Sequence, residues 1–145
     1  MSKNLAYRCV RDTSIVYHGA DAPSREEWET YLRDKGPQKG IQRKRSLIIS
    51  DGGALTSAQR KQLKQMMPER LPEHPMALLT DNALIRGSVT AMNWIGFRFS
   101  FAAFRRRDFD RACDYLGLTG AEREECREVV RQLEKEVRGS IRATA

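Results

Sequence analysis

Asp51, Gly52 and Gly53 form an acidic, glycine-containing turn whose residue types could carry chemistry. The short apolar run 47–49 precedes the turn, and Thr56 follows at a position where it can cap a helix, with Gln59 completing a capping box. A buried parallel strand that leads through such a turn into a helix is where open α/β sheets place functional loops. The turn could expose backbone amides that bind an anion or a partner. It could equally be structural, because aspartate and glycine build turns.

A second polar turn repeats this pattern further along the chain. The apolar segment 76–80 ends in Thr80, Asp81 and Asn82, and Asp81 or Asn82 can cap the next helix, which carries Arg86. If the two strands are neighbours, Asp51 and Asp81 share one rim of the sheet, where Arg86 could pair with an aspartate or help to bind a ligand. The predicted binding set on this rim is Asp51, Gly52, Gly53, Thr56, Ser57, Thr80, Asp81, Asn82 and Arg86.

No complete catalytic or metal-binding set is visible in the sequence. His18 and His74 lack a serine, cysteine or acidic partner at a spacing that implies a nucleophile–base pair. The three cysteines, Cys9, Cys113 and Cys126, have no paired spacing, which favours reduced, buried thiols. We therefore predict no catalytic residues, no metal, no cofactor and no enzymatic activity.

Composition and charge limit the possible classes of protein. A chain of 145 residues with 40% hydrophobic and 31% charged residues fits one globular domain. No apolar run approaches the roughly 20 residues that cross a bilayer, and the N-terminus has no signal-peptide pattern. These features predict a cytoplasmic protein without a membrane insertion.

The net charge of +7 raises the possibility of a polyanionic partner. Basic residues gather in 39–45 and in Arg105, Arg106 and Arg107. Such runs are mostly solvated loops, and neither an aromatic-interleaved basic strand nor a helix-turn-helix pattern supports nucleic-acid binding. Nucleic acid is thus the lesser alternative.

Local patterns predict a mostly parallel five-stranded sheet, covered by helices, in a single α/β domain over residues 1–145. Two strands, 5–10 and 14–18, form an antiparallel hairpin, and strands at 47–49, 76–80 and 97–101 follow after helices. The alternation of phenylalanine with polar residues places the last of these strands at the sheet edge. A further pair of helices covers 109–116 and about 119–138, and the tail 139–145 is expected to fray.

The helix boundaries are predicted from caps and breakers. Ser24 and Glu27 form a capping box for a helix to about Lys35, and the helix after Thr56 ends near 67. Asp108 is expected to cap the helix 109–116. The helix that begins near Asp81 carries Leu84, Ile85, Val89, Met92 and Trp94, and Trp94 is expected in the core.

This order of elements, with an acidic turn after the third strand, resembles the STAS (SpoIIAA-like) domains of anti-sigma-factor antagonists from Leu5 to about Leu116. In that family the turn usually reads Asp-Ser-Ser/Thr-Gly, and the hydroxyl after the aspartate is phosphorylated by a partner kinase. The matching positions here read Asp51, Gly52, Gly53 and Ala54, so Asp51 alone carries over, and Thr56 and Ser57 could be displaced substitutes. The resemblance implies a regulatory, partner-binding domain.

Receiver domains of response regulators offer a second comparison. Asp51 and Thr80 match the receiver's phosphoacceptor and hydroxyl positions in spacing. The acidic pair after the first strand and the lysine after the fifth are missing, and phosphoryl transfer to a carboxylate needs the metal and the cation that they supply.

The leading prediction is a non-enzymatic regulatory or protein-interaction module that binds a protein partner through 51–57 and 81–86. One alternative is a small anionic ligand or nucleotide at the same rim, and another is nucleic acid on the basic clusters. If all helices covered one face of the sheet, the open face could form a homodimer.

Overall fold

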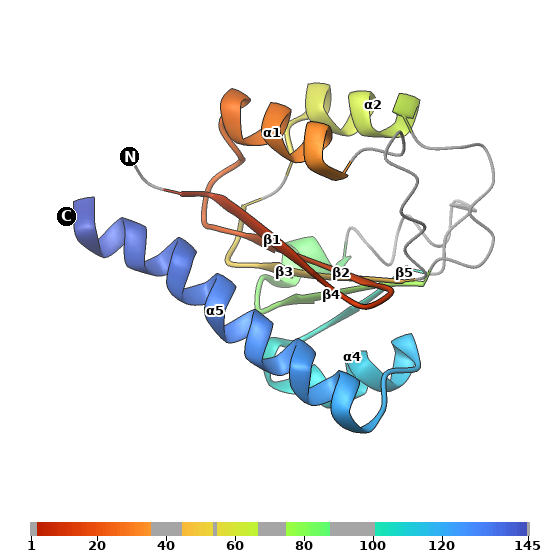
Figure 1. Cartoon of the computed structure of the whole chain (residues 1–145). Helices are drawn as coiled ribbons and strands as arrows, with labels where there is room; N and C mark the ends of the chain where they lie inside the picture. The colour runs from red at the N-terminus through yellow and green to blue at the C-terminus, as the bar shows by residue number, and fades with distance from the viewer. Residues whose placement is uncertain (1–2, 36–44, 54, 67–74, 88–100, 145) are drawn as a thin grey trace.

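The computed structural model describes residues 3–35, 45–53, 55–66, 75–87 and 101–144. The chain forms a five-stranded sheet with helices on both sides (Figure 1). The strands are β1 (Leu5–Val10), β2 (Thr13–His18), β3 (Arg45–Ser50), β4 (Met76–Thr80) and β5 (Phe101–Phe104). The helices are α1 (Arg25–Lys35), α2 (Ser57–Met66), the short 3₁₀ helix η2 (Arg106–Asp108), α4 (Phe109–Leu116) and α5 (Gly120–Thr144).

The strand order is β1-β2-β3-β4-β5, with β1 antiparallel to β2 and all other pairs parallel. The predicted fold class is therefore confirmed. The two apolar runs lie next to each other in the interior of the sheet, where Leu47 is opposite Ala77 and Ile49 opposite Leu79. This neighbourhood brings the turns after β3 and β4 to one rim. The last strand in the sheet order is β5, which begins at Phe101, where the predicted strand 97–101 ends; the rest of that predicted strand lies outside the described residues.

One face of the sheet packs against α4 and α5. Side chains that point alternately from the strands form the main core with the two helices. Cys113 and Cys126 belong to this core, and burial raises the pKa of both thiols to about 11. The core is built from Ala6, Val10, Ile15, Tyr17, Leu47, Ile49, Ala77, Leu79, Ala112, Cys113, Leu116, Leu118, Cys126, Val130, Leu133 and Val137.

The opposite side of the sheet carries α1 and α2 (Figure 1). Leu5, Val16 and Leu78 are buried there, as is Trp28 of α1, whose Nε1 donates to Gln62 of α2 at 2.9 Å. The homodimer predicted from an open sheet face thus has no such face among the described elements. Homodimer formation remains a prediction, and an open sheet face no longer supports it.

Two predicted capping boxes fix the starts of α1 and α2. Ser24 Oγ accepts from the Glu27 amide at 3.1 Å while Glu27 Oε1 accepts from the Ser24 amide at 3.0 Å. Thr56 and Gln59 make the same reciprocal bonds at 3.1 and 3.0 Å. The second carboxylate oxygen of Glu27 accepts from the amides of Asn4 and Leu5, at 2.8 and 3.0 Å. Glu27 therefore also ties α1 to the start of β1.

The structure corrects two local predictions and shows the environment of Leu84. The final helix continues to Thr144 instead of ending near 138, because one glycine at 139 costs a helix only about 1 kcal/mol. Asp108 makes no side-chain cap for α4, since η2 leads directly into that helix. Leu84 is 83% exposed, because Asn82 begins the helical residues 83–87 with Leu84 facing solvent.

Other predicted features lie outside the described residues. They are His74, the basic segment before Arg45, the helix residues Val89, Met92 and Trp94, and the phenylalanines Phe97 and Phe99.

Candidate functional site

The carboxyl ends of the parallel strands form a rim with a hollow of about 380 Å³. Asp51 follows β3, Asp81 follows β4 and Arg106 follows β5, so three successive strand ends contribute to it. Arg138 of α5, near the C-terminus in sequence, also lines the hollow. The lining residues are Ser50, Asp51, Asp81, Asn82, Arg106 and Arg138.

Asp51 is the centre of a charged network on this rim. Its Oδ1 accepts from the Tyr17 hydroxyl at 2.8 Å and from Arg106 Nη1 at 3.1 Å. Arg138 donates to both carboxylate oxygens, through Nη2 at 2.9 Å and Nε at 3.2 Å. Glu134 contacts the guanidinium groups of both arginines. The network thus joins β2, β3, η2 and α5.

These contacts keep the Asp51 carboxylate ionised. Burial raises the pKa of Asp51. Hydrogen bonds from Arg138 and Tyr17, together with the charges of the two arginines, lower it by more than burial raises it, so the pKa of Asp51 lies below its usual value. Burial, together with the hydrogen bond to Asp51, raises the pKa of Tyr17 to about 12. A carboxylate held by two guanidinium groups is a poor proton acceptor near neutral pH.

The Gly52–Gly53 turn is shaped by close packing against the loop after β2. Gly52 has a φ of +127°, which favours glycine, and a Cβ on Gly53 would lie 2.3 Å from the Asp21 carbonyl oxygen. The Gly53 amide donates to the Gly19 carbonyl at 2.8 Å, and the Gly52 amide donates to Ser50 Oγ at 3.1 Å. Both amides of the predicted anion-binding turn are therefore bonded within the chain.

The hydroxyl groups at the start of α2 have structural partners. Thr56 caps the helix as described above, and Ser57 Oγ accepts from Arg60 Nη2 at 3.1 Å. Both residues are exposed. They lie after the turn and do not line the hollow.

The turn after β4 is capped as predicted. Asn82 Oδ1 accepts from the amides of Leu84 and Ile85, at 3.0 and 3.2 Å, and Thr80 Oγ1 accepts from the Asn82 amide. Asp81 Oδ1 accepts from the Arg106 amide at 3.1 Å, which ties this turn to η2. Arg86 Nη1 donates to the Thr80 carbonyl at 2.9 Å.

The sequence did not reveal the cationic half of the network. Arg106 lies inside a run of three arginines that was interpreted as solvated, and Arg138 was assigned to the end of a mixed-charge helix. Tyr17 is the one member of the network that the sequence could have indicated, because it is a large phenolic residue just before the end of a predicted strand. Nothing local marks Arg138 as a partner of Asp51.

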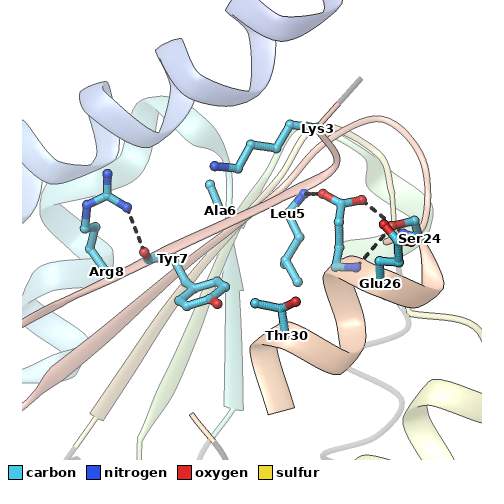
Figure 2. Close-up of a pocket in the computed structure, with 9 residues that line it drawn as sticks. Lys3, Leu5, Ala6, Tyr7, Arg8, Ser24, Glu26 and Thr30 are labelled. Atoms are coloured by element: carbon cyan, nitrogen blue, oxygen red, sulfur yellow. Dashed lines mark hydrogen bonds between the residues drawn. The ribbon is translucent and has the colours of Figure 1, made fainter. Parts of the chain in front are cut away.

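A second hollow, of about 530 Å³, lies beside β1 and α1 at the other edge of the sheet (Figure 2). Leu5, Tyr7 and Thr30 lie between the strand and the helix, and Lys3 and Arg8 lie on the other side of β1. Both cations pair with Glu136 of α5. These ion pairs stabilise the contact of β1 with α5, and they engage both cations that line the hollow.

Comparison with known proteins gives no guide to this site. No protein-family model matches the chain, and neither a curated protein nor a solved structure matches it significantly. Within the described ranges, no group of three or more side chains that could hold a metal ion is found. None of the helices in these ranges combines the length and the apolar character needed to cross a membrane.

Proposed function

We propose that the chain is a non-enzymatic protein-interaction module whose partner docks on the rim that holds Asp51 and Asp81. The exposed Leu84 carries the proposal, because it places a large apolar side chain in water two residues after Asn82, which lines the hollow. An exposed leucine alone is common on protein surfaces. Here Asp81 and Asn82 fix the turn before it, and full burial of such a side chain by a partner contributes about 2 kcal/mol.

The chemistry of Asp51 supports a binding role over a catalytic one. Its carboxylate is neutralised by Arg106 and Arg138, and its acidic pKa makes it unsuited to general-base chemistry near pH 7. The acidic turn after β3 also supports a STAS-like regulatory role, in which a displaced hydroxyl, Thr56 or Ser57, would carry the switch. Both hydroxyls are exposed at a helix N-terminus, where a phosphate is electrostatically favourable.

Site-specific photo-crosslinking tests the proposed surface. A photoreactive amino acid at position 84 should give a discrete protein adduct in the native cell, since the partner covers Leu84. The same amino acid at Arg25, whose side chain is 91% exposed on α1, is the matched control. Adducts of equal yield at both positions would contradict a docking site on the rim. Turnover of a phosphodonor or nucleotide that is lost on Asp51→Ala would contradict the non-enzymatic role.

A small anionic ligand is a second candidate for the same rim. The guanidinium groups of Arg106 and Arg138 line the hollow, and they could contact an anion if Asp51 released one of them. Thermal-shift measurements with phosphate and nucleoside phosphates separate the candidates, because a ligand of the folded state raises the melting temperature. A rise that disappears in Arg138→Ala would favour the ligand, whereas no rise with any anion would favour the protein partner.

A further inference from the structure

The short helix α4 has three distinct sides. Ala112, Cys113 and Leu116 are buried against the sheet. Asp110 and Asp114 pair with Arg127 and Arg123 of α5. The remaining side is exposed to solvent, and its charge is set by the residues of α4 and of the preceding η2.

The exposed side carries two arginines and a tyrosine. Arg111 and Tyr115 lie four residues apart on one side of α4, and Arg107 precedes them in η2. We refer to these three residues as the stripe. All three are exposed, and Tyr115 is 38% exposed although it is a large aromatic residue. At about 1.5 Å of rise per residue, Arg111 and Tyr115 lie about 6 Å apart along the axis of α4.

The edge strand β5 supports this stripe. The rings of Phe104 and Tyr115 are 5.9 Å apart between centroids and inclined by 57°, so Tyr115 packs against the end of β5. Arg105 follows Phe104 and is exposed as well. We define the β5-edge patch as Arg105, Arg107, Arg111, Tyr115 and the partly buried Phe104.

The charge of the patch is not neutralised locally. Asp108 is the acidic residue between these arginines, and within the described ranges it forms no ion pair with them, nor does another carboxylate pair with Arg105, Arg107 or Arg111. Several other arginines do pair with carboxylates, for example Arg11, which contacts both Glu122 and Glu125. Arg106 points away from the patch to Asp51. The edge therefore combines unmatched positive charge with an accessible aromatic ring.

We propose that the β5-edge patch binds single-stranded nucleic acid, with Tyr115 stacked on a base and Arg105, Arg107 and Arg111 in contact with phosphates. Single strands are bound in this way without sequence readout, because every base has a face for stacking and the backbone follows a basic surface. An acidic peptide would satisfy the charge but would make no use of the supported ring of Tyr115. This activity is separate from the proposed protein contact at Leu84.

Fluorescence anisotropy with a labelled oligothymidine tests the proposal. The strand should exceed the roughly 4 to 16 nucleotides that such sites occupy. We expect binding by the full chain that weakens steeply between about 50 and 200 mM salt. Tyr115→Leu, which keeps an apolar contact with Phe104, should weaken binding about tenfold, whereas Tyr115→Phe should retain it. Arg111→Ala should reduce the slope of log affinity against log salt by about one phosphate contact.

Matched controls separate a site from the general positive charge. Arg25→Ala removes the same charge at an exposed position on α1 and should leave the affinity and the salt slope nearly unchanged. Circular dichroism melting of each variant verifies that it is folded. The proposal would be overturned by no binding at low salt, by equal weakening in Arg25→Ala and Arg111→Ala, or by an unchanged affinity in Tyr115→Leu. Displacement of the strand by an equal charge of polyglutamate would also overturn it, and would assign the patch to acidic peptides.

Discussion

The contact of Asp51 with Arg106 should contribute more to stability than its contact with Arg138. Arg138 makes two hydrogen bonds to Asp51, one of them at 2.9 Å, while Arg106 makes one at 3.1 Å. Solvent screening reverses this ranking, because the side chain of Arg138 is 48% exposed and that of Arg106 is 21% exposed. Exposed ion pairs contribute about 0.2 to 1 kcal/mol, and less exposed charged hydrogen bonds about 1.5 to 3 kcal/mol.

Double-mutant cycles measure the two contacts separately. Asp51→Ala alone should cost about 3 kcal/mol, because it removes the acceptor of the Tyr17 hydroxyl and one of the acceptors of Arg106, which keeps only its weaker contacts with Tyr17 and Glu134. The coupling energy between Asp51→Ala and Arg106→Ala should be about 2 kcal/mol. The coupling with Arg138→Ala should stay below about 1 kcal/mol and should decrease with added salt.

Urea unfolding followed by circular dichroism gives the four free energies of each cycle. Arg131→Ala is the control: its ion pair with Glu128 on α5 is exposed, and its coupling to Asp51 should be zero within about 0.5 kcal/mol. A coupling of Arg138 larger than that of Arg106 would refute the argument from screening. A change in the urea m-value would show that the denatured state, and not the contact, had changed.

Three further predictions concern the supports of the site. Burial lowers the pKa of His18 from 6.5 to about 4. The free energy of unfolding should therefore reach its full value above pH 6.5 and fall by about 3 kcal/mol as the pH drops to about 4. The His18→Leu variant should lose this pH dependence in urea titrations. Gly53→Ala should destabilise the fold by about 2 kcal/mol or more in thermal unfolding because its Cβ meets backbone, whereas Gly87→Ala, with open space around it, should be neutral or stabilising. Glu27→Gln should cost about 2 kcal/mol in the same assay and speed hydrogen exchange at the start of β1, and unchanged exchange would contradict the bridging role of Glu27.

The sequence predicted the sheet because its signals are local. An apolar run, a glycine turn and a capping box each lie within a few residues, and the right-handed crossover then orders the parallel strands. The rim with Asp51 and Asp81 followed from the same reasoning, since neighbouring parallel strands end at the same edge.

The sequence alone determined which elements form and which turns meet at the rim, whereas the tertiary structure decided how the charges there are paired. Asp51 lies 55 residues before Arg106 and 87 before Arg138, so the pairing depends on how β5 and α5 pack onto the sheet. The same packing turns Arg106 inward and leaves Arg105 and Arg107 exposed, although all three share one local pattern. Periodicity and capping encode hydrogen bonds within a helix or turn, but a long-range ion pair is encoded only by the position of whole elements.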